Sequence, residues 1–312
     1  SDLPRTPNID ALARRGIRFT NGYSACTVCS PTRASIMTGK YPARLHLTDW
    51  IHGYNPKVEK LLGPEWTHYL PQEEVTIAEA LRAEGYKTAH LGKWHLGDEA
   101  FTPETQGFDV NIGGTHAGSP PGGYFLPNQL DLPGKSTDGI ALREPRDGEY
   151  LTDYLGDAAT EIIRNWSDRP FFMYMAFYTV HTPIQGKKDL TESYQAKILP
   201  ETLHRNATYA AMHQSLDEAV GKIVAALAEA DIARRTFIIF TSDNGGLSQT
   251  YGTPTNITVN PPLRRGKGSA YEGGVRVPLI ISWPGVSPGG VTCDEPVCSI
   301  DFYPTILEVT GS

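Results

Sequence analysis

Two uninterrupted apolar runs constrain the fold of this chain more than any other feature of its sequence. Phe171 to Tyr178 reads FFMYMAFY, and Phe237 to Phe240 reads FIIF, with no charged residue in either run. Such runs are typical of strands buried on both faces, which occur in parallel sheets covered by helices. Helical patterns separate the predicted strands. The sequence therefore predicts an α/β fold with a mostly parallel central sheet flanked by helices.

Local signals place the other elements. Thr6-Pro7 and Ser30-Pro31 are typical of an N-cap followed by the first turn of a helix, and Thr76 to Glu79 forms a capping box. The longest apolar pattern with helical spacing lies within residues 207–230. Further strands are predicted over 86–91 and 277–282, further helices over 31–37, 152–166 and 301–309, and loops over the Gly- and Pro-rich residues 105–150.

Composition narrows the class of partner. The 312 residues are 39% hydrophobic and carry a net charge of −7, which argues against a nucleic acid partner because phosphate backbones require a basic surface. No apolar run approaches about 18 residues, so we expect no membrane span, and no signal peptide pattern begins the chain. No linker or repeat divides the sequence. We expect one domain over residues 1–312.

Polar residues follow three of the predicted strands. Lys93 and His95 come after the strand over 86–91, His181 follows the FFMYMAFY run, and Asp243 and Asn244 follow the FIIF run. In open α/β sheets, ligands bind at the carboxyl edge of the strands, so these side chains are expected to converge there. The lysine and histidines suit an anion with several oxygens, and the Asp and Asn oxygens suit a hard divalent cation.

The four cysteines leave several readings open. Cys26 and Cys29 form a C-x-x-C pair, but Cys293 and Cys298 are spaced C-x₄-C far along the chain, which argues against a single Cys₄ zinc site. For Cys293 and Cys298 the sequence allows a local disulfide or two free thiols. Cys29 directly precedes the helix predicted to begin at Pro31, where free backbone N–H groups favour an anion.

Several segments, in order along the chain, resemble the conserved blocks of the sulfatase family. CSPTRASIMTG, from Cys29, resembles the family signature C-x-P-[ST]-R followed by T-G, and TPNIDALARRGIRFTN resembles the family's early helix. GKWHLG, VHTP, TSDNGG and RRGKGSAYEGGVRVP resemble later blocks. The resemblance implies an alkaline-phosphatase-like fold and a sulfuric ester hydrolase acting on a sulfated carbohydrate or an aryl sulfate. It also implies a periplasmic, extracellular or lysosomal type of compartment.

The resemblance further implies a cofactor chemistry. In this family the signature cysteine is oxidised by a formylglycine-generating enzyme, and the hydrated gem-diol attacks sulfur and later expels sulfate. Carried over to this sequence, the resemblance makes Cys29 the nucleophile precursor, Arg33 the support of the diol and metal region, and Lys93 and Lys267 the sulfate ligands. His95 would assist the elimination, and His181 would donate a proton to the leaving oxygen. Asp243 and Asn244, with residue 29, would bind Ca²⁺ or alternatively Mg²⁺.

The chain also departs from the family pattern. Relatives begin with a strand that ends in an Asp-Asp pair of calcium ligands and continue into a smaller C-terminal subdomain. The resemblance therefore implies that residues 1–312 are truncated at both ends, with an incomplete metal site and a missing inner strand. Asp2 is a single acid in a different context and is not assigned to the metal.

Other functions and the substrate stay open at this level. A phosphonate or phosphate monoester hydrolase of the same superfamily would use the same cations, and a non-catalytic binder of sulfated glycans would need no metal. The loop over 118–134 is predicted to shape specificity. Aromatic residues that either line a sugar-binding approach or pack in the core are Trp50, His52, Trp94, Tyr124 and Phe125.

Overall fold

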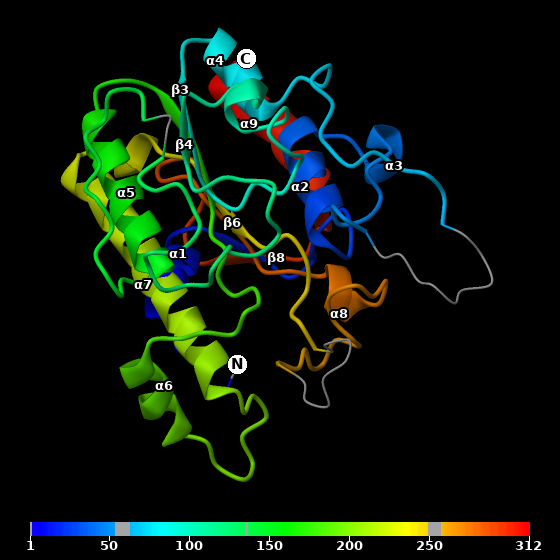
Figure 1. The fold of residues 1–312 in the computed structure, drawn as a ribbon, viewed down its shortest axis with the longest axis vertical. Coiled ribbons are helices and arrows are strands. Elements are labelled where there is room, and N and C mark those ends of the chain that lie inside the picture. The colour runs from blue at the N-terminus through cyan, green and yellow to red at the C-terminus, as the bar shows by residue number, and fades with distance from the viewer. Residues whose placement is uncertain (1, 54–62, 135–136, 249–256) are drawn as a thin grey trace.

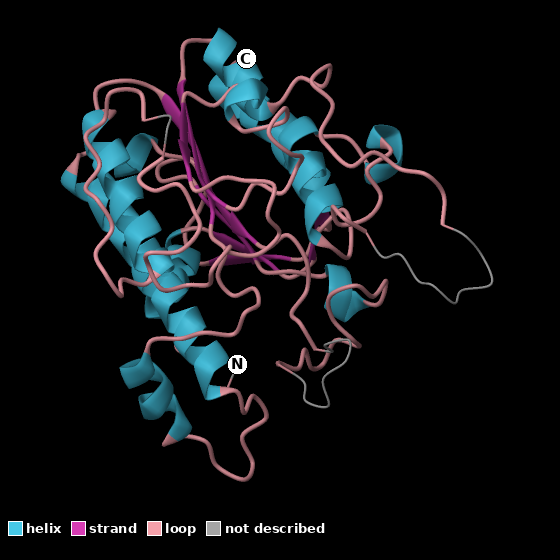
Figure 2. Ribbon diagram, in the orientation of Figure 1, coloured by secondary structure: helices cyan, strands magenta, loops and turns pink. Residues whose placement is uncertain are grey.

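Helices cover the strands of this molecule on two sides. The computed structural model describes residues 2–53, 63–134, 137–248 and 257–312. One layer contains α1 (Pro7–Arg15), α5 (Leu151–Asn165) and α7 (Ala207–Glu229), and the other contains α2 (Cys29–Thr38), α4 (Ile77–Ala83) and α9 (Phe302–Thr310). Figures 1 and 2 show the strands between these layers. The α/β fold class predicted from the sequence is confirmed.

The described strands form three hydrogen-bonded sheets. β3 (Lys87–Gly92) lies between β4 (Val110–Ile112) and β5 (Phe171–Ala176), and both neighbours are parallel to it. The second sheet has the order β6-β7-β1-β8, from β6 (Ile238–Thr241), β7 (Leu279–Ser282), β1 (Ile17–Phe19) and β8 (Val291–Cys293). There β7 is antiparallel to both neighbours, and β1 and β8 are parallel. β2 (Gly22–Tyr23) pairs in parallel with β9 (Val297–Cys298).

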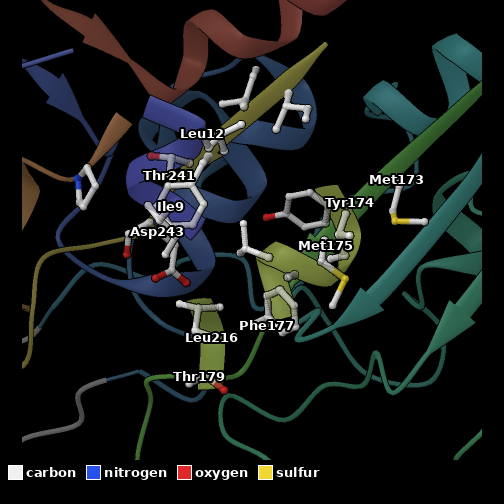
Figure 3. A pocket seen from close by; sticks show the side chains of 18 of the residues that line it. Ile9, Leu12, Met173, Tyr174, Met175, Phe177, Thr179, Leu216, Thr241 and Asp243 are labelled. Carbon is white, nitrogen blue, oxygen red and sulfur yellow. The ribbon is translucent and has the colours of Figure 1, made fainter. Parts of the chain in front are cut away.

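A cavity of about 1850 Å³ lies between β5 and β6. Figure 3 shows Met173 and Met175 of β5 on one side, and Thr241 of β6 with Ile9 and Leu12 of α1 on the other. Five of the six β5 residues are only partly buried because they border this space. The expectation that this strand is buried on both faces is therefore wrong for most of its length.

The remaining helical elements are short. α3 (Pro42–Leu45), α6 (Lys188–Gln195) and α8 (Glu272–Val275) lie in connections, as do three 3₁₀ turns, at Glu104–Gln106, Ala233–Arg235 and Ser299–Asp301. Within the described ranges, no helix is long and apolar enough to cross a membrane. The capping box predicted at the start of α4 is confirmed, because Thr76 and Glu79 each accept the other's backbone N–H.

The start of α1 is capped by a residue of α7. Buried Asp217 accepts the backbone N–H groups of Asn8 and Ile9 at 3.0 and 2.8 Å, and the Asn8 side-chain amide at 2.8 Å. Thr6, predicted as the N-cap, makes no side-chain capping bond. The orphan donors of this helix are thus satisfied by a carboxylate from a distant segment, which locks α1 onto α7.

Candidate active site

Cys29 is the first residue of α2. The helix begins two residues before the predicted start at Pro31, because Val28 is the extended N-cap, with φ −140° and ψ 168°. Every residue of α2 is buried, and Cys29 is 3% exposed. The first turn of a helix has backbone N–H groups without intrahelical partners and the positive end of the helix dipole. Residue 29 therefore lies where a negative charge is stabilised.

Lys267 and His181 lie directly beside the Cys29 thiol. Lys267 Nζ is 3.3 Å from Cys29 Sγ and 3.0 Å from His181 Nε2. His181 Nδ1 lies 3.0 Å from the carbonyl oxygen of Thr182, which can only accept, so Nδ1 carries the proton and the Nε2 lone pair accepts from the lysine ammonium. Burial lowers the pKa of His181, which favours this neutral ring.

His95 presents a free lone pair to the same pocket. Its Nε2 lies 3.1 Å from the carbonyl oxygen of Ile51, so Nε2 must donate and Nδ1 is left unprotonated. Among the described residues Nδ1 is buried without a hydrogen-bond partner, and the ring lies near enough to Cys29 for the thiol to affect its pKa. Burial lowers the pKa of His95. The ring is therefore a neutral acceptor close to residue 29.

Arg33 connects α2 to the ends of two strands. It follows Cys29 by one helical turn, and its Nε donates to Asp243 Oδ2 at 2.8 Å. Its NH1 group donates to the Lys93 carbonyl at 2.6 Å. Burial opposes ionisation of Asp243, but the Arg33 charge outweighs it and lowers the pKa of the carboxyl. By bonding both residues, Arg33 fixes the carboxyl ends of β3 and β6 against the start of α2.

A glycine turn brings Lys93 into the pocket. Gly92 has a φ of +94°, and a Cβ there would lie 2.1 Å from the Ala176 carbonyl oxygen of β5, so only glycine fits. Lys93 is 2% exposed. Burial lowers the pKa of its ammonium to about 8. The lysine is thus a buried cation whose charge is available to an anion in the pocket.

Close backbone packing holds Lys267 in place. The loop after β6 and the segment from Arg264 to α8 are joined by two hydrogen bonds, Gly245 N–H to Gly274 O at 2.9 Å and Lys267 N–H to Gly246 O at 3.0 Å. A Cβ on Gly245 would lie 1.8 Å from the Gly273 carbonyl oxygen. The glycines of both blocks therefore allow the approach that directs Lys267 to Cys29.

The charges of the site favour an anion at residue 29. Burial raises the pKa of the Cys29 thiol, but the charges of Lys93 and Lys267 outweigh it. The net result is a pKa well below the usual value for a thiol. Two cations beside the start of a helix likewise suit a substrate with several anionic oxygens.

Asp243 and Asn244 have the donor chemistry of a calcium site. In the part of the chain that the structure describes, Asn244 Oδ1 is buried without a hydrogen-bond partner, while its Nδ2 donates to Gly245 O at 2.9 Å. Ca²⁺ binds oxygen ligands of this kind, namely an amide oxygen without a partner beside a carboxylate. A Ca²⁺ ion usually takes six to eight such ligands. Among the described residues, no cluster of three or more His, Cys, Asp or Glu could hold a metal. These two residues therefore fit a cation but supply only part of its coordination.

The structure brings together all eight residues singled out from the sequence, and it adds others. Ser30, Ile51 and Thr182 take part through a hydroxyl or backbone carbonyls, for which no sequence motif exists. All four cysteines are free thiols. Of the candidate sugar-contacting aromatics, Trp94 and Tyr124 are buried packing residues, whereas Trp50, His52 and Phe125 are exposed.

The site is a pocket that holds Lys93 and Lys267 at the start of a helix, on the carboxyl edge of an α/β fold, and similarity to known proteins gives its family. A family model described as Sulfatase matches residues 1–312. A Sulfatase of Formosa agariphila is 35% identical, over 98% of this chain and 63% of the relative. Arylsulfatase A of Homo sapiens is 32% identical, over 98% of this chain and 59% of the relative. This chain belongs to the sulfatase family.

The comparison with solved structures agrees with this family assignment. The crystal structure of Ps i-CgsB superposes with a TM-score of 0.80 at 32% identity, covering 100% of this chain and 68% of that chain. The same protein in complex with k-i-k-neocarrahexaose gives a TM-score of 0.79 at 31% identity, covering 100% of this chain and 67% of that chain. The present chain spans less than two thirds of the length of the curated relatives named above.

Proposed function

We propose that this chain is the catalytic part of a sulfuric ester hydrolase that releases inorganic sulfate from a sulfate monoester. The observation that carries the proposal is the contact of Lys267 Nζ with Cys29 Sγ at 3.3 Å, in a pocket where His95 presents an unprotonated Nδ1. Membership of the sulfatase family supports the same reaction. We place the active enzyme in a periplasmic, extracellular or lysosomal type of compartment.

Residue 29 has the setting that a formylglycine requires. When formed from cysteine by a formylglycine-generating enzyme and hydrated, formylglycine supplies a hydroxyl nucleophile with a second hydroxyl on the same carbon. The surroundings of Cys29 fit such a group, because His95 offers an acceptor and Lys267 a donor within the buried pocket. An apolar pocket would leave both hydroxyls unsatisfied.

The two lysines bind the sulfate group in this proposal. Lys93 and Lys267 both act on the charge at residue 29 from within the pocket, so an anion attached near this residue meets both ammonium groups. Fixed cations in a site that excludes water stabilise the negative charge that develops as the S–O bond breaks. Removing one such donor typically costs about 10²- to 10³-fold in kcat.

The histidines move protons in opposite directions. His95 Nδ1 is positioned to take the proton of the residue-29 hydroxyl, because Ile51 holds the other ring nitrogen as a donor. On the other side, Lys267 and His181 share a hydrogen bond of 3.0 Å between Nζ and Nε2. We infer that the proton held by this pair is the one delivered to the leaving alcohol oxygen.

Asp243 and Asn244, together with residue 29, would hold Ca²⁺ or Mg²⁺. A bound divalent cation supplies positive charge that polarises the oxygens of residue 29 and of the sulfate. Arg33 keeps Asp243 ionised and in place through the 2.8 Å ion pair. The arginine is therefore assigned the support of the metal ligands rather than a contact with substrate.

The substrate class that we favour is a sulfated carbohydrate. One relative of solved structure binds k-i-k-neocarrahexaose at 31% identity to this chain. The test is sulfate release, after coexpression with a formylglycine-generating enzyme, from 4-nitrophenyl sulfate and from defined sulfated saccharides. An aryl phosphonate ester is measured in parallel. We expect sulfate release that falls by at least about 10²-fold in Lys267→Ala. Faster turnover of the phosphonate, or undiminished activity of Lys267→Ala, would contradict the proposal.

A further inference from the structure

The turn around Ile51 is fixed to the candidate active site from two sides. The Ile51 N–H donates to Ser30 Oγ at 3.0 Å, and the Ile51 carbonyl accepts from His95 Nε2 at 3.1 Å. Ser30 follows Cys29 directly, and the His95 ring lies near the Cys29 thiol. Trp50 directly precedes Ile51, so its Cα lies about 3.8 Å from that of Ile51. The indole therefore starts beside the groups that hold the catalytic histidine.

Trp50 is accessible, in contrast to the other tryptophan near the pocket. Its side chain is 38% exposed, and among the described residues its indole makes no ring contact or hydrogen bond. Trp94 is 1% exposed, and its indole N–H donates to the Phe101 carbonyl at 2.7 Å. A single exposed apolar residue is common on protein surfaces. What distinguishes Trp50 is an anchored backbone next to a site that binds an anion.

The segment on the other side of His95, which contains Thr115 and Gly118, places no side chain of Gly118 over the ring. A Cβ added to Gly118 would lie 2.7 Å from His95 Cε1, so this residue covers the ring with backbone alone. The His95 N–H donates to the Thr115 carbonyl at 3.0 Å, which fixes that segment as well. The His95 ring thus has bare backbone on one side and the turn that carries an aromatic side chain on the other.

We propose that the indole face of Trp50 is the stacking surface for the sugar ring of the substrate. The inference rests on the proposed function and extends it, because it names the residue that selects a carbohydrate. The C–H face of a pyranose packs against a flat apolar ring, and Trp offers the largest such face among the side chains. Because Ile51 connects this turn to His95, a stacked sugar is held in a fixed position relative to residue 29.

Binding without turnover tests this directly. Protein made without the formylglycine-generating enzyme is titrated by calorimetry with a 4-O-sulfated galactose disaccharide and a 6-O-sulfated N-acetylglucosamine disaccharide. We expect binding of at least one disaccharide, a Kd raised about 10-fold or more in Trp50→Ala, and recovery to within about threefold in Trp50→Phe. Tyr41→Ala is the matched control: Tyr41 is 55% exposed and lies beyond the far end of α2, roughly 15 Å from Cys29 along the helix.

The outcomes separate the two proposals. Equal Kd values for wild type and Trp50→Ala, an equal loss in Tyr41→Ala, or no binding of either disaccharide would overturn the role of Trp50. Sulfate release from 4-nitrophenyl sulfate by converted wild-type enzyme is measured independently. If that release is absent, the proposed reaction fails while the binding comparison still decides the role of Trp50. Circular dichroism of each variant confirms that a change in Kd does not come from unfolding.

Discussion

Replacing Gly245 with alanine displaces Lys267 without touching any side chain of the site. The new Cβ would lie 1.8 Å from the Gly273 carbonyl oxygen, and such contacts essentially never fall below 3.0 Å, so the two loops must separate by at least 1.2 Å. The position of Lys267 depends on the same contact, because its backbone N–H donates to Gly246 O, the residue after Gly245. A displacement of this size carries its Nζ beyond hydrogen-bond distance of residue 29, from the present 3.3 Å.

We expect two measurable results for Gly245→Ala. Misplacement by about 1 Å costs on the order of 10²-fold in rate, so kcat/KM on 4-nitrophenyl sulfate should fall by about that factor. Overpacking should lower the free energy of unfolding by about 1–3 kcal/mol, measured by urea denaturation. Gly63→Ala is the control, since a Cβ at Gly63 meets no described residue within 4 Å and its φ is not in the left-handed region. Wild-type kcat/KM in Gly245→Ala would refute the reasoning.

Three further changes probe other parts of the molecule. Asp217→Ala should lower the free energy of unfolding by about 1–3 kcal/mol, because three N–H donors at the start of α1 lose their acceptor; unchanged urea denaturation would contradict the cap. Raising pH through about 8 should reduce kcat/KM as Lys93 loses its proton, since its lowered pKa removes the charge earlier than in free lysine. In Lys93→Arg this alkaline limb of the pH–rate profile should move upward, because the guanidinium stays charged, and an unmoved limb would assign it to another group. Calcium should bind this 312-residue chain only at about millimolar Kd, since Asp243 and Asn244 supply few of the usual ligands; micromolar binding by calorimetry would show a more complete site.

Local patterns were sufficient for most of the regular elements. The capping box at Thr76, the apolar run from Phe171 and the helical spacing over 207–230 all depend on neighbours in the sequence, and each corresponds to an observed element. The cap of α1 could not be predicted, because Asp217 lies 209 residues from Asn8. The antiparallel pairing of β7 also depends on long-range register, which short apolar strands do not encode.

The site was predictable as a set but not as a mechanism. The parallel strands β3 and β5 share a carboxyl edge, which accounts for the convergence of Lys93 and His181. Asp243 follows β6, which lies in another sheet with an antiparallel partner, so its place depends on how the two sheets pack. Lys267 reaches Cys29 across 238 residues through glycine contacts that only the packed loops reveal. The protonation of His95 depends on the Ile51 carbonyl. Because every residue has a backbone carbonyl, the sequence does not indicate which one contacts His95.

The state of residue 29 tests the central claim most directly. The tryptic peptide from Phe19 to Arg33 contains both Cys26 and Cys29, and mass spectrometry with an aldehyde-reactive hydrazide locates any conversion. In a host with a formylglycine-generating enzyme, we predict an aldehyde at residue 29, a cysteine at residue 26, and sulfate release that rises in proportion to the converted fraction. Cys29→Ala should fold normally and release no sulfate. Full sulfatase activity with an unconverted Cys29, or with alanine at this position, would contradict the account.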